Sequence, residues 1–281
     1  MALCFEIELG SVNQEFDIKR LLSSNMGYGV YEDAYRLHEG VIGSPTVIFD
    51  AERIGRGVEV DVEEGKLVFS SSVPSTNSDV ELLFNLLQRA MELTGAKEMI
   101  FDEKAVACGL SGELKDEIKQ IHQKALRVLE DALEDENQRQ LLIHGATQVV
   151  SIDRQEARQM VESWDEFGEY LHRVQAQDLY FAVPMFLERN DGILALYILS
   201  DGVRSSFPLE KNFLVDTEQL VVSKWAVGFF DRASEDLMGM IPYDDFLADV
   251  DTSDMLDAER FIVKLDIDAM KELLEKYGEA L

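Results

Sequence analysis

Closely spaced aspartates near the C-terminus are the residues most able to bind a cation or a basic partner. The segment 235–268 carries eleven acidic residues against two basic ones. Asp249, Asp251 and Asp254 suggest a calcium loop, but that loop needs glycine at position six and glutamate at position twelve. Asp254 and Arg260 occupy these positions, so a dedicated calcium site is not expected. The segment is interpreted as a solvated acidic face or as a docking surface for a basic protein. The candidate patch consists of Asp244, Asp245, Asp249, Asp251, Asp254 and Asp257.

Two arginines are candidates for binding an anion. Arg56 precedes an expected strand, and Arg204 follows the turn-forming sequence at 200–202. A guanidinium near free backbone amides can form charge-assisted hydrogen bonds to a carboxylate or phosphate. The alternative is a structural ion pair, which is the more common role of arginine in a folded protein.

The motifs of several common enzyme classes are absent or broken. Residues 27–29 (Gly-Tyr-Gly) begin like a dinucleotide fingerprint, but Glu32 occupies its sixth position, where glycine is required. The sequence contains neither a Gly-Lys-Ser/Thr phosphate loop nor a Gly-x-Ser-x-Gly nucleophile elbow. The four histidines lack metal-site spacing, and Cys4 and Cys108 do not form a CxxC motif. A Cys108–His pair stays open, because sequence does not reveal spatial neighbours. We therefore expect that the protein binds no metal and no cofactor, and we favour a protein without catalytic activity over an enzyme.

The charge of the chain limits its partners. Asp and Glu total 55 against 26 Lys and Arg, which gives a net charge of −29. A field of this sign repels nucleic acids and anionic membranes, and it attracts basic protein surfaces. No apolar run approaches the roughly 18 residues that cross a membrane, and the N-terminus lacks the basic region of a signal peptide. We expect a cytoplasmic protein that binds neither nucleic acid nor membrane.

Hydrophobic periodicity predicts the elements that must position these residues. Valines alternate with acidic residues in a β-hairpin at 56–72. A second hairpin at 180–199 turns at Asn190-Asp191-Gly192, and its apolar character on both faces predicts a central position in a covered sheet. Pro184 indicates a bulge or an edge there. A long amphipathic helix covers 112–136. The fold class is α+β, with mainly antiparallel sheets packed against helices.

Local signals divide the chain further. Ser78 and Glu81, and Ser163 and Glu166, match the capping box at a helix start. The glycine-rich segment 25–44 is expected to be a loop with a short helical turn. The predicted parts are an N-terminal α+β half at 1–110, a helical connector at 111–145 and a C-terminal α+β half at 146–281, with one continuous domain as the alternative.

Two short segments resemble a known family. They are Arg56-Gly57-Val58-Glu59-Val60 in the first hairpin and Pro74-Ser75-Thr76-Asn77-Ser78-Asp79-Val80 at a helix start. Both are similar to an uncharacterised family of Gram-positive bacterial proteins, a domain of unknown function. The resemblance implies a cytoplasmic bacterial protein without an assigned activity, and it transfers no functional residue.

The function predicted from these features is binding without catalysis. An acidic surface would engage a basic protein, as an immunity or inhibitor protein does, in a salt-sensitive complex. One alternative is an enzyme that uses scattered carboxylates for acid–base or weak metal-assisted chemistry. Another is an oligomeric structural protein in which the hairpin at 180–199 supplies the interface. The sequence leaves the oligomeric state open.

Overall fold

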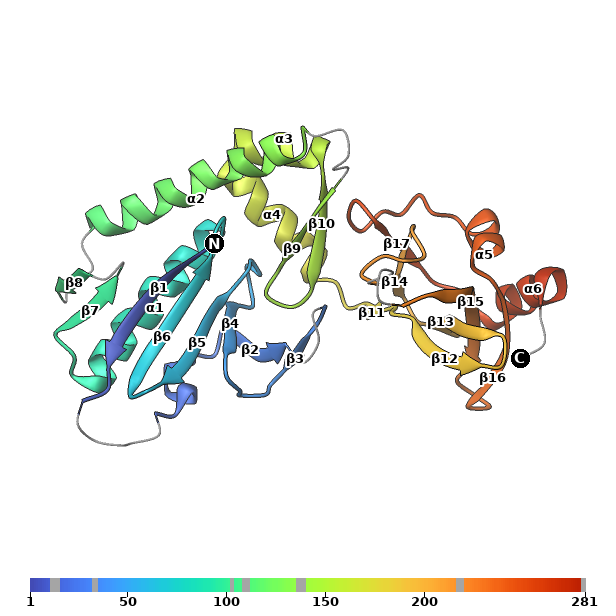
Figure 1. Cartoon of the computed structure of the whole chain (residues 1–281), viewed down its shortest axis with the longest axis horizontal. Helices are drawn as coiled ribbons and strands as arrows, with labels where there is room; N and C mark the ends of the chain where they lie inside the picture. The colour runs from blue at the N-terminus through green and yellow to red at the C-terminus, as the bar shows by residue number, and fades with distance from the viewer. Residues whose placement is uncertain are drawn as a thin grey trace. The chain divides into compact units, whose positions relative to one another are not determined.

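The computed structural model of the chain describes residues 1–10, 16–31, 35–101, 104–107, 112–134, 140–215 and 220–278. The chain divides into two compact units, Met1–Ala176 and Gln177–Leu281, which are considered separately below (Figure 1). Both units contain helices beside mainly antiparallel sheets, so the predicted α+β class is confirmed.

An eight-stranded antiparallel sheet forms the centre of the first unit. Its order is β3-β2-β4-β5-β6-β1-β7-β8. The strands are β1 (Ala2–Glu8), β2 (Met26–Tyr31), β3 (Leu37–Glu39), β4 (Thr46–Asp50), β5 (Val58–Glu63), β6 (Lys66–Ser72), β7 (Glu98–Phe101) and β8 (Lys104–Ala107). β5 and β6 are the predicted first hairpin, closed where Glu63 faces Lys66, and Gly65 in its turn has a φ of 82°. This hairpin is therefore confirmed.

The predicted loop at 25–44 is wrong, because β2 and β3 run through it. The glycines serve close packing in the sheet and not a turn. A Cβ built on Gly27 would lie 2.2 Å from the ring of Phe49, and one on Gly29 would lie 2.4 Å from the His38 carbonyl oxygen. Glu32 and Cys108, which the sequence singles out, lie outside the described residues.

Helices and a small two-stranded sheet complete the first unit. They are η1 (Ile18–Leu21), α1 (Asn77–Thr94), α2 (Gly112–Ala132), α3 (Arg154–Glu162), α4 (Trp164–Gln175), β9 (Gln140–His144) and β10 (Val149–Asp153). α1 packs against β4, β5 and β6, and it ends at Gly95 in the left-handed conformation. The predicted long helix is α2.

The boundary between the units lies later in the chain than the predicted boundaries, which place a connector at 111–145 and a second half at 146–281. α2 packs against α1 and α3, and α4 packs against α1 and β10, all within the first unit. The buried apolar side of α2 thus belongs to the core of the first unit.

Both predicted capping boxes differ from the structure. α1 begins one residue after Thr76, and its capping box joins Thr76 to Asp79. Glu81 instead forms ion pairs with Lys115 and Lys119 of α2. Ser163 does precede α4, but its side chain makes no capping hydrogen bond.

The second unit contains two sheets and two helices among its described residues. The four-stranded sheet has the order β12-β13-β15-β16, and the three-stranded sheet has the order β11-β14-β17. The elements are β11 (Tyr180–Phe181), β12 (Met185–Arg189), β13 (Gly192–Ser200), β14 (Ser205–Pro208), β15 (Val222–Asp231), β16 (Asp236–Pro242), α5 (Tyr243–Asp249), β17 (Arg260–Val263) and α6 (Ile267–Tyr277). Aromatic side chains such as Tyr197, Phe207 and Phe246 fill the core between these elements.

The second predicted hairpin is confirmed, but its two strands lie in different environments. β12 and β13 are antiparallel, and Arg189 faces Gly192 across the turn. β13 is a central strand that buries Leu194, Ala195 and Leu196, whereas every residue of β12 is exposed. The prediction of a strand pair covered on both faces is thus wrong for β12, which is an edge strand preceded by Pro184.

Candidate functional site

Two of the three guanidinium nitrogens of Arg56 contact backbone carbonyls in the first unit. Its Nε donates to the His144 carbonyl and its Nη1 to the Pro74 carbonyl, each at 2.8 Å. Burial lowers the pKa of Arg56, and the nearby Asp79 carboxylate partly offsets this shift. These contacts give Arg56 a structural role, but through backbone carbonyls and not through the ion pair expected from the sequence. Anion binding at Arg56 stays a prediction that the contacts do not favour.

Asp79 joins the two segments that carry the family resemblance. Its carboxylate accepts hydrogen bonds from the amides of Arg56 and Gly57, both at 2.8 Å. It also accepts from the hydroxyls of Ser75 and Thr76 at 2.7 Å and from the Thr76 amide at 3.1 Å. The side chain is buried, and these donors satisfy it. A Cβ on Gly55 would lie 2.3 Å from Asp79 Oδ2, so the loop at 55–57 has no room for a larger residue there.

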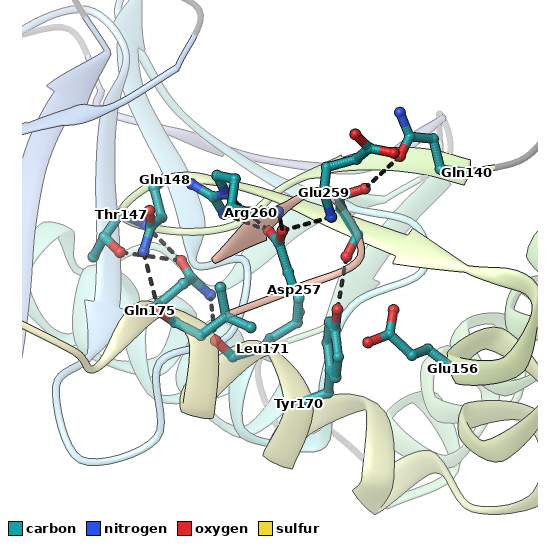
Figure 2. Close-up of polar contacts among 12 residues, drawn as sticks. Gln140, Thr147, Gln148, Glu156, Tyr170, Leu171, Gln175, Asp257, Glu259 and Arg260 are labelled. Atoms are coloured by element: carbon teal, nitrogen blue, oxygen red, sulfur yellow. Dashed lines mark hydrogen bonds and ion pairs between the residues drawn. The ribbon is translucent and has the colours of Figure 1, made fainter. Parts of the chain in front are cut away.

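A buried amide holds the same loop from its other side. The side-chain nitrogen of Gln175 donates to the carbonyls of Gly55 at 2.8 Å and Leu171 at 3.1 Å. Its oxygen accepts from the Thr147 amide at 2.9 Å (Figure 2). The loop at 55–57 is therefore fixed between the start of α1 and the end of α4.

His122 of α2 is buried beside Asp79 without forming a catalytic triad. Its Nδ1 accepts the Ser75 amide at 2.9 Å, so a neutral ring carries its proton on Nε2. That nitrogen is buried and has no hydrogen-bond partner among the described residues. The Ser75 hydroxyl donates to Asp79 and not to the ring, and Trp164 stacks on His122 at a centroid distance of 6.3 Å. The cluster is closed to solvent and has a structural role.

The protonation of His122 should make the first unit sensitive to acid. Burial lowers the pKa of His122 from 6.5 to about 4, with Arg56 lowering it further and Asp79 opposing the shift. Between pH 6.5 and 4 the unfolded chain gains a proton that the folded chain does not, so stability is lost as the pH falls. We expect the free energy of unfolding to drop by about 2 kcal/mol more between pH 7 and 4.5 than in His122→Gln. Urea unfolding at both pH values measures this, and parallel pH profiles for the two proteins would contradict it.

One open cavity in the second unit brings together four of the predicted site residues. Arg204, Asp249, Asp251 and Asp254 line a space of about 680 Å³. Asp249 ends α5, the next two aspartates follow in the loop, and Arg204 precedes β14. The wall is completed by apolar residues of β17 and of the loop, and by residues of α6. These further lining residues include Val250, Ile262, Val263, Lys264, Leu265, Glu272, Leu273 and Lys276.

Hydrogen bonds lower the pKa values of two carboxylates of this cavity, Asp249 and Asp251. Lys276 contacts Asp249 at 2.8 Å, and this hydrogen bond lowers the pKa of Asp249. Hydrogen bonds from the side chain and amide of Ser253 lower the pKa of Asp251. Lys276 compensates the charge of Asp249. The cavity is also lined by three further acidic and two further basic residues, which are Asp251, Asp254, Glu272, Arg204 and Lys264. The arrangement suits binding of a charged group more than transfer of a proton.

The other aspartates of the predicted patch lie elsewhere. Asp244 forms an exposed ion pair with Lys211 at 3.2 Å, and Asp245 lies in the first turn of α5. Asp257 is buried, and Arg260 donates to it from Nη2 at 2.5 Å and from Nε at 3.0 Å (Figure 2). Three of the six aspartates therefore line the cavity, and Asp257 stabilises the unit from within.

The sequence did not indicate the contribution of α6. Glu272 and Lys276 lie one turn apart on the tail helix, a spacing that puts both on one face. This spacing is the feature of the sequence from which the contribution of α6 could have been predicted. The packing of α6 in the second unit is what places that face beside the aspartates.

Among the described ranges, no group of three or more His, Cys, Asp or Glu residues is arranged to hold a metal ion. Within the same ranges, no helix is both long and apolar enough to cross a membrane.

Comparison with known proteins identifies the family of the chain. A model of the family described as a domain of unknown function (DUF4299) matches residues 2–273. No curated protein and no solved structure matches the chain.

Proposed function

The chain belongs to this family of domains of unknown function, and we propose that it is a binding protein for a basic protein segment. The description of the family names no activity, so the proposal rests on the geometry of the chain. The cavity of the second unit would receive that segment. The proposal rests on one observation: Asp251, Asp254 and Glu272 line the same open cavity, together with apolar residues. The resemblance and the charge support a cytoplasmic location in a Gram-positive bacterium as part of the same proposal.

The lining of the cavity suits a lysine or arginine side chain. Val250, Ile262 and Leu273 offer apolar surface to its methylene stem. Asp251 and Asp254, both exposed, can then accept hydrogen bonds from its charged end. Arg204 and Lys264, which also line the cavity, would pair with acidic residues of the partner and exclude segments that are basic throughout.

The electrostatics favour binding over acid–base catalysis. A general acid or base works best with a pKa near the operating pH. The pKa values of Asp249 and Asp251 are instead lowered by their hydrogen bonds, so both stay anionic. The net charge of −29 adds a long-range attraction that would speed the approach of a basic partner.

A matched pair of variants tests the proposal. Asp251→Asn/Asp254→Asn removes two charges from the cavity, and Asp116→Asn/Glu117→Gln removes two from an exposed face of α2. The probe is a labelled ten-residue peptide of alternating lysine, alanine and glutamate with an excess of lysine. At low salt we expect about tenfold weaker binding by the cavity variant and less than about twofold weaker binding by the α2 variant.

Salt provides the second part of this test. Binding should weaken strongly when the salt rises from about 50 to about 500 mM, because the charges are exposed. An equal loss of affinity in both variants would show that the peptide senses only the net charge, and the proposed site would then be rejected.

A further inference from the structure

β12 is an edge strand that exposes apolar side chains. It lies at the end of the four-stranded sheet, beside β13 (Figure 1). Met185, Phe186 and Leu187 are 46%, 42% and 42% exposed, respectively. Edge strands of monomeric proteins normally carry charges, prolines or bulges at such positions, because an open apolar edge pairs with other strands. In β12 such residues lie only at its two ends, because Pro184 precedes the strand and Glu188 and Arg189 end it.

The turn of the hairpin determines which backbone groups of β12 are open. Arg189 faces Gly192 across a two-residue turn, and such a turn closes on a hydrogen-bonded pair. Hydrogen-bonded and non-hydrogen-bonded pairs then alternate along an antiparallel ladder. Leu187 and Met185 therefore direct their N–H and C=O groups toward β13. The N–H and C=O groups of Phe186 and Glu188 point away from it, toward the open edge.

We propose that β12 pairs with β12 of a second copy of this chain, antiparallel and across a two-fold axis. The two four-stranded sheets would join into one continuous sheet. This inference goes beyond the proposed function, since it uses no residue of the cavity.

The open groups of β12 select one register for this pairing. With Leu187 on the axis, Phe186 of each copy faces Glu188 of the other, and four backbone hydrogen bonds form. With Phe186 on the axis, Glu188 would face Pro184, which has no N–H to donate. With Glu188 on the axis, two carboxylates would face each other and repel. Only the register centred on Leu187 uses every open group without such a conflict.

Self-pairing also fits the charge of the strand. β12 contains Glu188 and Arg189 and is therefore neutral, within a chain of net charge −29. Two strongly acidic copies can therefore pair through β12 without adding like charges to their interface. Added salt screens the repulsion between the rest of the two copies, so the dimer should strengthen as salt rises. The complex with a basic partner should weaken under the same change, so the two proposals fail separately.

Sedimentation equilibrium of the full chain tests the pairing. The native chain should show a monomer–dimer equilibrium in the micromolar range that shifts toward dimer at about 500 mM salt. Leu187→Lys puts two ammonium groups on the axis and should raise the dimer dissociation constant at least about tenfold. Glu188→Pro removes an open-edge N–H and should do the same, while its pairing with β13 needs no N–H from this residue.

Two controls keep the outcome clear. Val128→Lys makes a similar change at a residue of α2 that is 64% exposed, and it should leave the dimer intact. Circular dichroism should show unchanged thermal unfolding in each β12 variant that becomes monomeric. A native chain that stays monomeric at both salt concentrations would overturn the inference, as would a dimer that persists in both β12 variants.

Discussion

Asp79→Ala is expected to lower the free energy of unfolding of the first unit by about 3–5 kcal/mol, because it removes the acceptor of several buried donors. The amides of Arg56 and Gly57 would lose their partner, as would the hydroxyl of Ser75. Thr76 would also lose the reciprocal contact of the capping box at the start of α1. One substitution thus affects the loop before β5, the segment after β6 and the first turn of α1 together.

Urea unfolding followed by the fluorescence of Trp164 measures this effect. A Trp225→Phe background removes the other tryptophan, which lies in the second unit. Asp79→Asn keeps the shape but loses acceptor capacity, so it should fall between the native chain and Asp79→Ala. Asp116→Asn on the exposed face of α2 should change stability by less than about 0.5 kcal/mol. A loss below about 1 kcal/mol for Asp79→Ala would contradict the central role of this carboxylate.

Arg260→Met is expected to destabilise the second unit by about 3–5 kcal/mol. The Arg260 and Asp257 side chains are 2% and 0% exposed, so the substitution leaves a buried carboxylate without its guanidinium. The aromatic rings of Phe181 and Phe213 also lie 4.9 and 5.9 Å from the guanidinium and would lose its contact.

The double variant Arg260→Met/Asp257→Leu separates charge from packing. Replacing both partners removes the buried carboxylate together with the guanidinium, so much of the stability should return. Unfolding in urea, read from Trp225 in a Trp164→Phe background, gives both values. If Arg260→Met unfolds at the same urea concentration as the native chain, the ion pair does not stabilise this unit.

Local patterns in the sequence predict the elements that depend on near neighbours. The alternating valines predict the hairpin of β5 and β6, and amphipathic helical spacing predicts α2. The register at the start of α1 depends instead on distant groups. Asp79 is engaged by amides of Arg56 and Gly57, more than twenty residues earlier, and this contact favours Thr76 over Ser78 as the cap.

The candidate site also depends on contacts that local sequence patterns do not predict. Charge density identifies Asp249, Asp251 and Asp254 as a group, because they are close in sequence. Their meeting with Arg204 and with Lys276 of α6 follows from the packing of the second unit. Pro184 does indicate the edge position of β12, but the sequence does not show that the apolar residues of this strand are exposed, because an apolar run looks the same in a central strand and in an edge strand.

The cavity of the second unit is proposed to bind a basic segment. The most direct measurement follows the backbone amide resonances of the full chain as the ten-residue peptide is added at low salt. Binding in this cavity predicts that the shifts concentrate at Asp251, Asp254 and Lys264 and disappear in Asp251→Asn/Asp254→Asn. Shifts spread over the acidic surface of both units, with none larger in 249–276, would contradict it.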